Sequence, residues 1–344
     1  MIRPAVPAAI AVASVVAALA AAPAGAADNA ALFAGKTINI VIGYPPGGGF
    51  DLAARMVVQY YGRFIPGNPS MVAQNMPGAS SFKASNYIYN VAPKDGTYLG
   101  ALDSTIPLAQ KTKGGGKFQP EKFAWIGRIS ADDSVGLVWH TTGVKTIEDA
   151  RHKQVMMASG AAAGPSAMIC WALNRLAGTK FKVILGYNGS GPMVASMEQG
   201  ETGGAGTFGY NALKLLKRHW IEQKLVNIIY TSGLKRNPEL PDVPALPELG
   251  KNDLDRRALE MIAARSDIGR AYAGPPGMSP ERVEVMRRAF DTMVKDPTFL
   301  ADMAKRKFEL SPATGEEVQK VVTSVMEASP EVVERTTWAT AVEK

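Results

Sequence analysis

The stretch Thr37-Ile38-Asn39-Ile40-Val41-Ile42-Gly43-Tyr44-Pro45-Pro46-Gly47-Gly48-Gly49-Phe50-Asp51 joins an apolar run to a glycine-rich turn. Residues 37–43 have the pattern of a buried strand, and residues 52–62 have that of a helix. Three glycines at a strand-to-helix turn let the backbone come close to a small ligand. The first amides of the helix then point at that ligand and favour an anion. The stretch therefore predicts half of an anion-binding cradle.

The first 27 residues have the composition of a secretory signal peptide. Arg3 supplies the positive charge, an uncharged apolar run covers residues 8–22, and Ala24-Gly25-Ala26 is a small-residue cleavage site. The alternative is a transmembrane anchor, but the run is shorter than the ~20 residues that a span needs. We therefore expect residues 1–27 to be a signal peptide and the mature chain to be exported.

Length, charge and cysteine content limit the possible classes of protein. The chain without residues 1–27 has 344 − 27 = 317 residues, which favours two domains over one core. The single cysteine, Cys170, excludes an internal disulfide framework and is expected to be a core thiol. The net charge of +7 comes from scattered residues, with no basic stripe of the kind that binds nucleic acid. A mild positive charge would help to attract acidic solutes.

The alternation of predicted strands and helices indicates an α/β architecture. The expected strands cover residues 37–43, 97–102, 135–139, 154–158, 181–186 and 226–230. The expected helices cover residues 52–62, 166–177, 192–199, 208–219 and 281–294. The last helix has the clearest pattern, because Ser279 can cap it and Val283, Met286, Phe290 and Met293 recur at helical spacing.

Several catalytic and cofactor motifs are missing or incomplete. The three histidines, His140, His152 and His219, are not spaced to form a zinc site, and no Gly-x-Ser-x-Gly elbow occurs. Residues 204–209, Gly-Ala-Gly-Thr-Phe-Gly, match the dinucleotide spacing, but no acidic residue follows about 20 positions on. We therefore expect no cofactor, no metal and no nucleotide.

Three further loops rich in small and hydroxyl residues follow strand-like runs. They cover residues 75–81, 159–166 and 187–192, and the last two open helices. Taken singly, each could be an ordinary tight turn, since Gly and Ser are common there. In an α/β sheet, however, the loops after the strands lie on the edge where ligands bind. Their amides and hydroxyls could together hold a carboxylate without an arginine.

At this level of detail the chain resembles the extracytoplasmic solute receptors of tripartite tricarboxylate transporters, the TctC or Bug family. Five motifs occur in the order that the family has them. They are Gly48-Gly49-Phe50-Asp51 followed by Ala54-Arg55; Asn75-Met76-Pro77-Gly78-Ala79 followed by Ala92-Pro93-Lys94-Asp95-Gly96-Thr97-Tyr98; Tyr187-Asn188-Gly189-Ser190-Gly191-Pro192; Leu240 to Leu246; and Gly274-Pro275-Pro276-Gly277-Met278-Ser279-Pro280. The chain departs from the family at Ser80-Ser81, where glycines are usual, and at 161–165, where a Ser-rich stretch is common.

The resemblance implies a two-lobed periplasmic binding protein of the venus-flytrap, type II-like architecture, with a hinge that the chain crosses twice. The first lobe would combine residues 28–138 and 250–344, and the second would cover 139–249. The protein would be a periplasmic monomer without enzymatic activity. It would capture a small carboxylate-bearing solute and deliver it to the membrane permease subunits of the transporter.

The resemblance also implies a set of ligand-binding residues in the two lobes. The first lobe would contribute Tyr44, Pro46, Gly47, Gly48, Gly49, Phe50, Asp51, Ser80 and Ser81. The second would contribute Gly160, Ala161, Ser166, Tyr187, Gly189, Ser190, Thr207 and Phe208. Since a carboxylate beside an anionic ligand repels it, we interpret Asp51 as organising the loop and its amides. Direct contact with an ammonium or hydroxyl group of the ligand is the alternative.

Two other functions remain open from the sequence. An exported hydrolase could use Ser159, Ser166 or Ser190, although no general base is evident nearby. A sensor could bind the same solute and dock on a membrane signalling protein.

Overall fold

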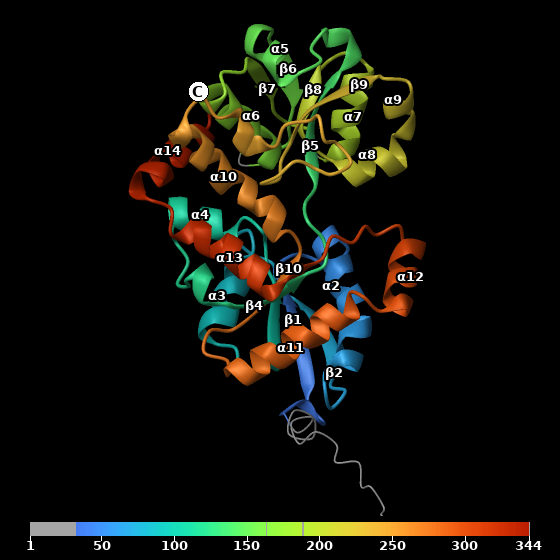
Figure 1. Cartoon of the computed structure of the whole chain (residues 1–344), viewed down its shortest axis with the longest axis vertical. Helices are drawn as coiled ribbons and strands as arrows, with labels where there is room; N and C mark the ends of the chain where they lie inside the picture. Colours follow the sequence, from blue (N-terminus) through green and yellow to red (C-terminus); the bar gives the residue numbers. More distant parts are fainter. Residues whose placement is uncertain (1–31, 163, 188, 344) are drawn as a thin grey trace, which may run out of the picture.

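A computed structural model describes residues 32–162, 164–187 and 189–343. The expected signal peptide lies outside these residues. The chain forms two lobes, one above the other along the long axis of the molecule (Figure 1). Each lobe is built on its own mixed β-sheet with helices around it. The expectation of a two-lobed α/β architecture is confirmed.

The first lobe contains a six-stranded sheet of order β11-β4-β10-β3-β1-β2. Its strands are β1 (Thr37–Ile42), β2 (Ser70–Asn75), β3 (Tyr98–Ala101), β4 (Ala124–Arg128), β10 (Ala271–Gly274) and β11 (Ala313–Thr314). Strand β1 pairs in parallel with β2 and β3, whereas β10 runs antiparallel to β3 and β4. The loops after β1, β2 and β3 therefore leave from one edge of the sheet.

The second lobe contains a five-stranded sheet of order β7-β6-β8-β5-β9. Its strands are β5 (Ser134–Trp139), β6 (Val155–Ala158), β7 (Phe181–Ile184), β8 (Gly204–Gly209) and β9 (Val226–Thr231). Strand β6 pairs in parallel with β7 and β8, and β5 runs antiparallel to β8 and β9. The loops after β6, β7 and β8 thus share one edge, as in the first lobe.

Helices cover the sheets of both lobes and connect them (Figure 1). Around the first sheet lie α2 (Gly49–Tyr60), α3 (Phe82–Asn90), α4 (Ile106–Lys113), α11 (Pro280–Met293), α12 (Pro297–Lys305) and α13 (Gly315–Met326). Around the second lie α5 (Ile147–His152), α6 (Pro165–Leu176), α7 (Ser190–Glu198), α8 (Tyr210–Leu216) and α9 (Arg218–Glu222), and α10 (Asp253–Ile268) and α14 (Pro330–Thr340) lie towards the junction. Short 3-10 helices cover Tyr61–Phe64, Pro120–Lys122, His140–Thr142 and Leu246–Leu249. Among the helices of the described ranges, none has both the length and the apolar composition needed to cross a membrane.

Helix α11 forms where its sequence predicts it. The Ser279 hydroxyl accepts a hydrogen bond from the Arg282 amide, and Pro280 occupies the first turn. Met286, Phe290 and Met293 are buried in the core of the first lobe, while Val283 packs at its margin. The apolar residues that recur at helical spacing in this segment therefore form the face of α11 that packs on the core.

The segment expected to be a helix over 208–219 is divided differently. Residues 204–209 form strand β8, and two short helices, α8 and α9, follow. The glycine spacing in this segment belongs to a strand. Gly206, for example, lies so close to α6 that an added Cβ would come within 2.4 Å of the Ser166 carbonyl oxygen. Close packing of β8 on α6 accounts for this small residue.

The chain passes between the lobes at other positions than the sequence indicated. The expected boundary between residues 138 and 139 falls inside β5, all of which belongs to the second sheet. The first crossing therefore lies in residues 129–133. Part of α10 packs in the second-lobe core through Ala258, Leu259 and Ile262. The terminal helix α14 joins the same core through Ala339, so residues 327–329 form a third crossing after the two expected ones.

The first-lobe core gives a stability prediction. Phe290 is fully buried between β4 and the 3-10 helix that begins at Tyr61. The rings of Phe290 and Tyr61 meet edge to face, with their centroids 5.6 Å apart. Replacing Phe290 by Ala should destabilise the fold by about 3–5 kcal/mol, because a large cavity is left behind. Leu300→Ala on α12 is the control, since that side chain is 41% exposed. Equal losses in urea unfolding for the two variants would contradict this packing.

Candidate functional site

The loop after β1 presents the start of α2 to solvent. Gly48 precedes the helix in extended conformation and provides no side-chain cap. Gly47 has a φ of +88°, which a residue with a Cβ rarely adopts. Gly47, Gly48 and Gly49 are all exposed. Because the first amides of a helix have no partner within it, this turn can hold an anion through its backbone.

Asp51 holds this loop in shape. It is only 2% exposed, and its Oδ2 accepts a hydrogen bond from the Gly47 amide at 2.9 Å. Arg55 Nε lies 3.0 Å from both carboxylate oxygens, and Asn75 Nδ2 donates to Oδ1 at 2.7 Å. Asn75 Nδ2 also donates to the Tyr44 carbonyl oxygen at 3.0 Å. Asp51 therefore joins both ends of the loop to α2 and β2, which is the loop-organising role that we inferred from the sequence.

The partners of Asp51 also keep its charge in place. The hydrogen bond from Arg55, together with those from the Gly47 amide and Asn75, lowers the pKa of Asp51 from 3.8 to about 2, against the opposing effect of burial. The adjacent guanidinium offsets the negative charge of Asp51 at the base of the loop. An anion above the loop therefore meets weaker repulsion than an isolated carboxylate would produce.

The loop after β2 is strained, and only part of it faces the space between the lobes. Ala79, Ser80 and Ser81 all have positive φ values, of 46°, 49° and 71°. Ser81 is fully buried, and its hydroxyl accepts a hydrogen bond from the Asp103 amide at 3.3 Å. A Cβ on Gly43 would come within 1.7 Å of that hydroxyl oxygen. Only glycine at position 43 therefore leaves room for the Ser81 side chain. Ser80 is exposed, whereas Ser81 has a structural position.

An aromatic pair closes the first-lobe side of the site. The rings of Tyr44 and Phe50 stack at 4.5 Å with an interplanar angle of 18°. The Tyr44 hydroxyl donates to Asp103 Oδ2, and burial together with the Asp103 charge raises the pKa of Tyr44 well above its usual 10. Asp103 also accepts from the Thr105 amide at 2.6 Å. The loop after β3 thus belongs to the site, although our sequence interpretation did not include it.

The predicted second-lobe loops lie side by side after β6 and β7. The Gly186 amide donates to the Gly160 carbonyl oxygen at 2.9 Å, and the Tyr187 amide donates to that of Ser159 at 3.2 Å. Ala161, Gly189 and Ser190 are exposed, while Gly160 and Tyr187 are partly buried. The structure therefore brings these five predicted residues into one cluster.

Three other predicted second-lobe residues lie in or behind β8. The Ser166 hydroxyl donates to the Ala158 carbonyl oxygen at 3.2 Å and accepts from the Gly206 amide at 3.1 Å. Phe208 is 6% exposed and packs in the core with Trp220, and Thr207 is partly buried on β8. Ser166 and Phe208 are thus used by the fold itself, and the binding roles that we expected for them do not match these positions.

A cavity of about 560 Å³ lies between the lobes. It is lined by Tyr44, Phe50, Ser80, Asp103, Ser104, Thr105, Leu108, Ala109, Thr112, Lys113, Asp132, Ala162, Pro165, Met168, Arg265, Thr337, Thr340, Ala341 and Val342. Of the predicted ligand-binding residues, it includes Tyr44, Phe50 and Ser80. It also includes Ala162 and Pro165 from the predicted 159–166 loop. The walls formed by α4, α10 and α14 were missed, because no motif marks them.

Two of the three serines considered for a hydrolase, Ser159 and Ser166, have no histidine partner among the described residues. The Ser166 hydroxyl is engaged with the backbone, and the buried Ser159 hydroxyl has no hydrogen-bond partner among the described residues. His152 interacts with Glu148 on the exposed face of α5. Within the part of the chain that the structure describes, no group of three metal-ligating side chains is placed to bind a metal ion.

The architecture of two lobes joined at a hinge, with a cavity and opposed loops between them, is the one that two-lobed solute-binding proteins have. No protein-family model matches the chain. A curated relative, the UPF0065 protein in the gbd 5' region of Cupriavidus necator, is 25% identical over 313 residues, which cover 89% of this chain and 88% of the relative.

Solved structures of TctC and Bug type have the same fold. A TctC solute-binding protein from Polaromonas, without ligand, aligns with a TM-score of 0.66 at 19% identity, over 85% of this chain and 96% of that one. MatC from Rhodopseudomonas palustris, with bound malate, aligns with a TM-score of 0.56 at 16% identity, over 90% of this chain and 100% of that one. The resemblance inferred from the five motifs is confirmed, and the fold is that of these periplasmic binding proteins.

The Asp51 interactions give a pH prediction. Because the pKa of Asp51 is lower in the folded protein than the unfolded value near 3.8, its charge stabilises the fold above that pH, and this stabilisation is lost as the pH falls through about 2. The difference corresponds to roughly 2 kcal/mol. The free energy of unfolding, measured in urea, should fall between pH 5 and pH 2 by less in Asp51→Asn than in the wild type, because the variant lacks the contribution of the Asp51 charge.

The control variant is Asp242→Asn, at an exposed position in the loop before the 3-10 helix at Leu246. It should follow the wild-type pH dependence. An Asp51→Asn protein with an unchanged pH dependence would mean that Asp51 does not hold the loop through its charge.

Proposed function

We propose that the protein is a periplasmic solute-binding protein that captures a small carboxylate-bearing solute between its lobes and delivers it to a tripartite tricarboxylate-type permease. The observation that carries this proposal is the uncapped start of α2, exposed at Gly47 to Gly49 and supported from below by Asp51. Backbone amides at a helix start bind a carboxylate through charge-assisted hydrogen bonds. Such contacts are reversible, as a transport receptor requires.

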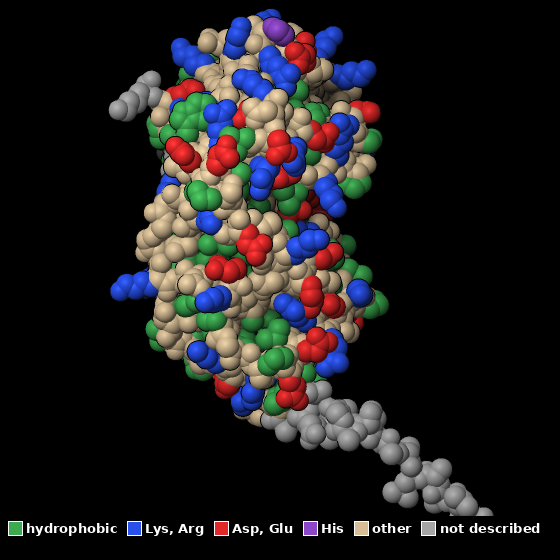
Figure 2. Space-filling model, turned by 60° about the vertical axis from the view of Figure 1, so that its left-hand side comes forward, with side chains coloured by type: hydrophobic (Ala, Val, Ile, Leu, Met, Phe, Trp, Pro, Cys, Tyr) green, Lys and Arg blue, Asp and Glu red, His purple; other side chains and the backbone are tan. Residues whose placement is uncertain are grey.

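Local geometry, more than overall charge, accounts for the proposed selectivity for anions. Basic and acidic side chains are interspersed over both lobes on the face shown in Figure 2. A net charge of +7 would aid the approach of an anion, but it gives no fixed geometry. The amides of Gly48, Gly49 and Phe50 are fixed by the turn itself. The Tyr44–Phe50 stack lies beside them and would shield the bound group from water.

The second lobe would complete the site from the opposite side. The exposed residues Ala161, Gly189 and Ser190 lie in adjoining loops that open helices α6 and α7. Their backbone and hydroxyl groups would contact the far end of the solute on closure. A malate-bound relative fold supports a carboxylate as the class of ligand.

Closure would be assisted by a contact between charged side chains of the two lobes. Lys214 on α8 lies 2.9 Å from Glu239 and 3.6 Å from Glu309, which follows α12 of the first lobe. Burial raises the pKa of Glu309, and Lys214 opposes that change. We propose that this contact forms in the closed state. Export through the signal peptide, a monomeric state and docking on permease subunits belong to the same proposal.

Ligand binding should appear as thermal stabilisation. A carboxylate present at ~100 times its Kd stabilises the fold by about 2.7 kcal/mol. This corresponds to a melting shift of several degrees for a protein of this size. A thermal-shift screen of mono-, di- and tricarboxylates on ligand-free protein should identify at least one such compound. If no carboxylate shifts the melting temperature, the proposed function is wrong.

The cradle itself is tested at Gly48, where an added side chain has open space around it. Gly48→Asp should cap α2 and leave the fold intact, since Asp is a favoured residue before a helix. The carboxylate would occupy the same amides and repel the ligand, so the affinity should fall at least ~10-fold, equivalent to about 1.4 kcal/mol. Gly48→Asn is the neutral control, and the difference between the two variants in calorimetric titration isolates the charge. Equal affinities for both would place the anion elsewhere.

A further inference from the structure

The cavity between the lobes contains a buried arginine whose hydrogen bonding is incomplete. Arg265 lies on α10 and is 7% exposed. Its Nη2 donates to Asp132 Oδ2, where the first crossing between the lobes ends. Its Nε and Nη1 are buried and have no hydrogen-bond partner among the described residues. A guanidinium has five N–H donors, so most of them here are unused.

Unused donors on a buried cation destabilise the protein, because they have lost water without a replacement. An anionic group entering the cavity would supply the missing acceptors. Carboxylates match the planar guanidinium geometry closely and form short, charge-assisted hydrogen bonds with it. Arg265 therefore indicates a carboxylate-binding position within the cavity, about which the five sequence motifs say nothing.

The remaining walls of the cavity are mainly apolar. Leu108 and Ala109 come from α4, and Pro165 and Met168 come from α6. The threonines in the lining do not add free hydroxyl groups to this surface. Thr112, Thr337 and Thr340 each donate to a carbonyl oxygen of their own helix, at 2.7–2.8 Å. Most of the surface that the body of a ligand would contact in this cavity is therefore carbon.

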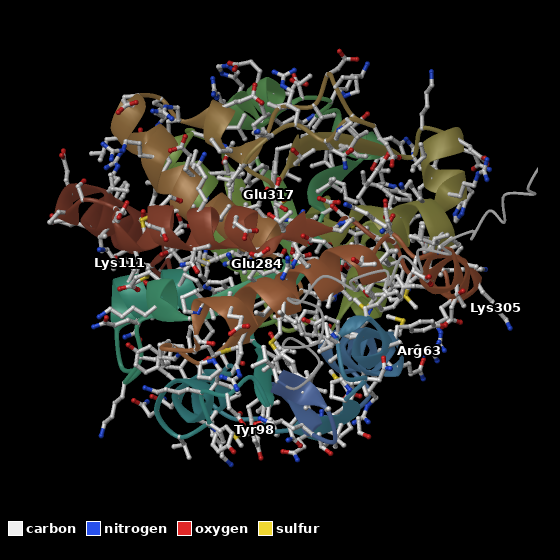
Figure 3. The ribbon with its side chains drawn as sticks, turned by 60° about the horizontal axis from the view of Figure 1, so that its bottom comes forward. Arg63, Tyr98, Lys111, Glu284, Lys305 and Glu317 are labelled. Atoms are coloured by element: carbon white, nitrogen blue, oxygen red, sulfur yellow. The ribbon has the colours of Figure 1, made fainter. Side chains whose placement is uncertain are left out.

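These walls are held in fixed positions. Arg175 Nη1 donates to the carbonyl oxygens of Trp338, Ala339 and Ala341, at 2.7, 2.9 and 2.7 Å, and so holds the end of α14 against α6. On the opposite side, Lys111 of α4 lies against α13 (Figure 3), and its Nζ donates to the Met326 carbonyl oxygen. The cavity thus has a defined shape before any ligand enters.

The acidic residues of the lining limit the number of carboxylates that a ligand can have. Asp103 already accepts hydrogen bonds from Tyr44 and Thr105. Asp132 already accepts hydrogen bonds from Arg265 and Ser134. A second carboxylate on the ligand would lie near their negative charges and would be repelled. Lys113, the other cation of the lining, is exposed to solvent, so Arg265 is the one buried cation of the cavity lining, beside two acidic side chains, which favours a single carboxylate.

We infer that the solute is a monocarboxylate with an apolar body. Its carboxylate would lie between Arg265 and the amides at the start of α2, where Phe50 lines the same cavity, and the body would fill the space between α4, α6 and α14. A volume of about 560 Å³ is in the range of sites that enclose small organic ligands. The inference rests on the proposed function and specifies its ligand class. It also assigns to Arg265 a role in selecting the ligand.

The test uses 3-phenylpropionate, its uncharged amide and malate as probes of the full mature chain, by thermal shift and calorimetry. Phenylpropionate should bind the wild-type protein, and the amide should not. Arg265→Gln should weaken phenylpropionate binding roughly 10-fold or more, since a buried charge-assisted contact is lost. Ala109→Phe, on the partly exposed face of α4, should block binding by filling the cavity while Arg265 stays intact.

Arg287→Gln is the control for loss of a paired guanidinium, since Arg287 pairs with Glu316 away from the cavity. It should leave phenylpropionate binding unchanged. Malate binding that is unaffected by Arg265→Gln and Ala109→Phe, with no binding of phenylpropionate, would overturn this inference and leave the proposed function standing. Phenylpropionate binding that is insensitive to both cavity variants would also overturn it. Absence of binding by any carboxylate would reject the proposed function together with the inference.

Discussion

The carboxylate of Asp51 is the interaction on which the first half of the site depends. It is buried among the Gly47 amide, Arg55 and Asn75, and so connects the turn, the first helix and the neighbouring strand. A glycine-rich turn without such a fixed point would sample many conformations, because glycine restricts the backbone so little. One internal acidic group therefore converts a flexible sequence into a surface of oriented amides. The same group would oppose an anion if Arg55 did not balance it.

The sequence was sufficient to predict the features that depend on neighbouring residues in the chain. The strand and turn at Thr37 to Asp51, the cap of α11 and the burial of Cys170 all follow from spacing and residue type. The helix predicted over 208–219 is present as α8 and α9, but the sequence missed strand β8 before it. Gly-Ala-Gly-Thr-Phe-Gly has weak strand propensity, and its pairing with β5 overrides that preference. Arg265, Asp103 and the end of α14 could not be assigned to a site. They come together only after the chain has passed between the lobes, and no pattern in the sequence around each of them predicts that contact.

The two sheets repeat one arrangement, although their sequences are unlike. The orders β2-β1-β3-β10-β4 and β7-β6-β8-β5-β9 match position for position, and in each sheet the fourth place is taken by an antiparallel strand next to a crossing. This repetition explains why the ligand-facing loops of both lobes leave from equivalent edges and oppose one another. It also places the strands nearest the hinge inside their sheets, where both neighbours hold them.

The return of α14 to the second lobe affects how the lobes can move. Two connections that run side by side, at residues 129–133 and along the end of α10, leave a pair of rigid bodies free to bend and also to twist. The third connection, at residues 327–329, lies apart from them on the side of α13 and α14 (Figure 1). A third attachment point set apart from the other two resists rotation about the long axis of the molecule. The easiest remaining motion is a bending of the two lobes towards one another. A solute of any shape therefore meets the same two surfaces in the same alignment.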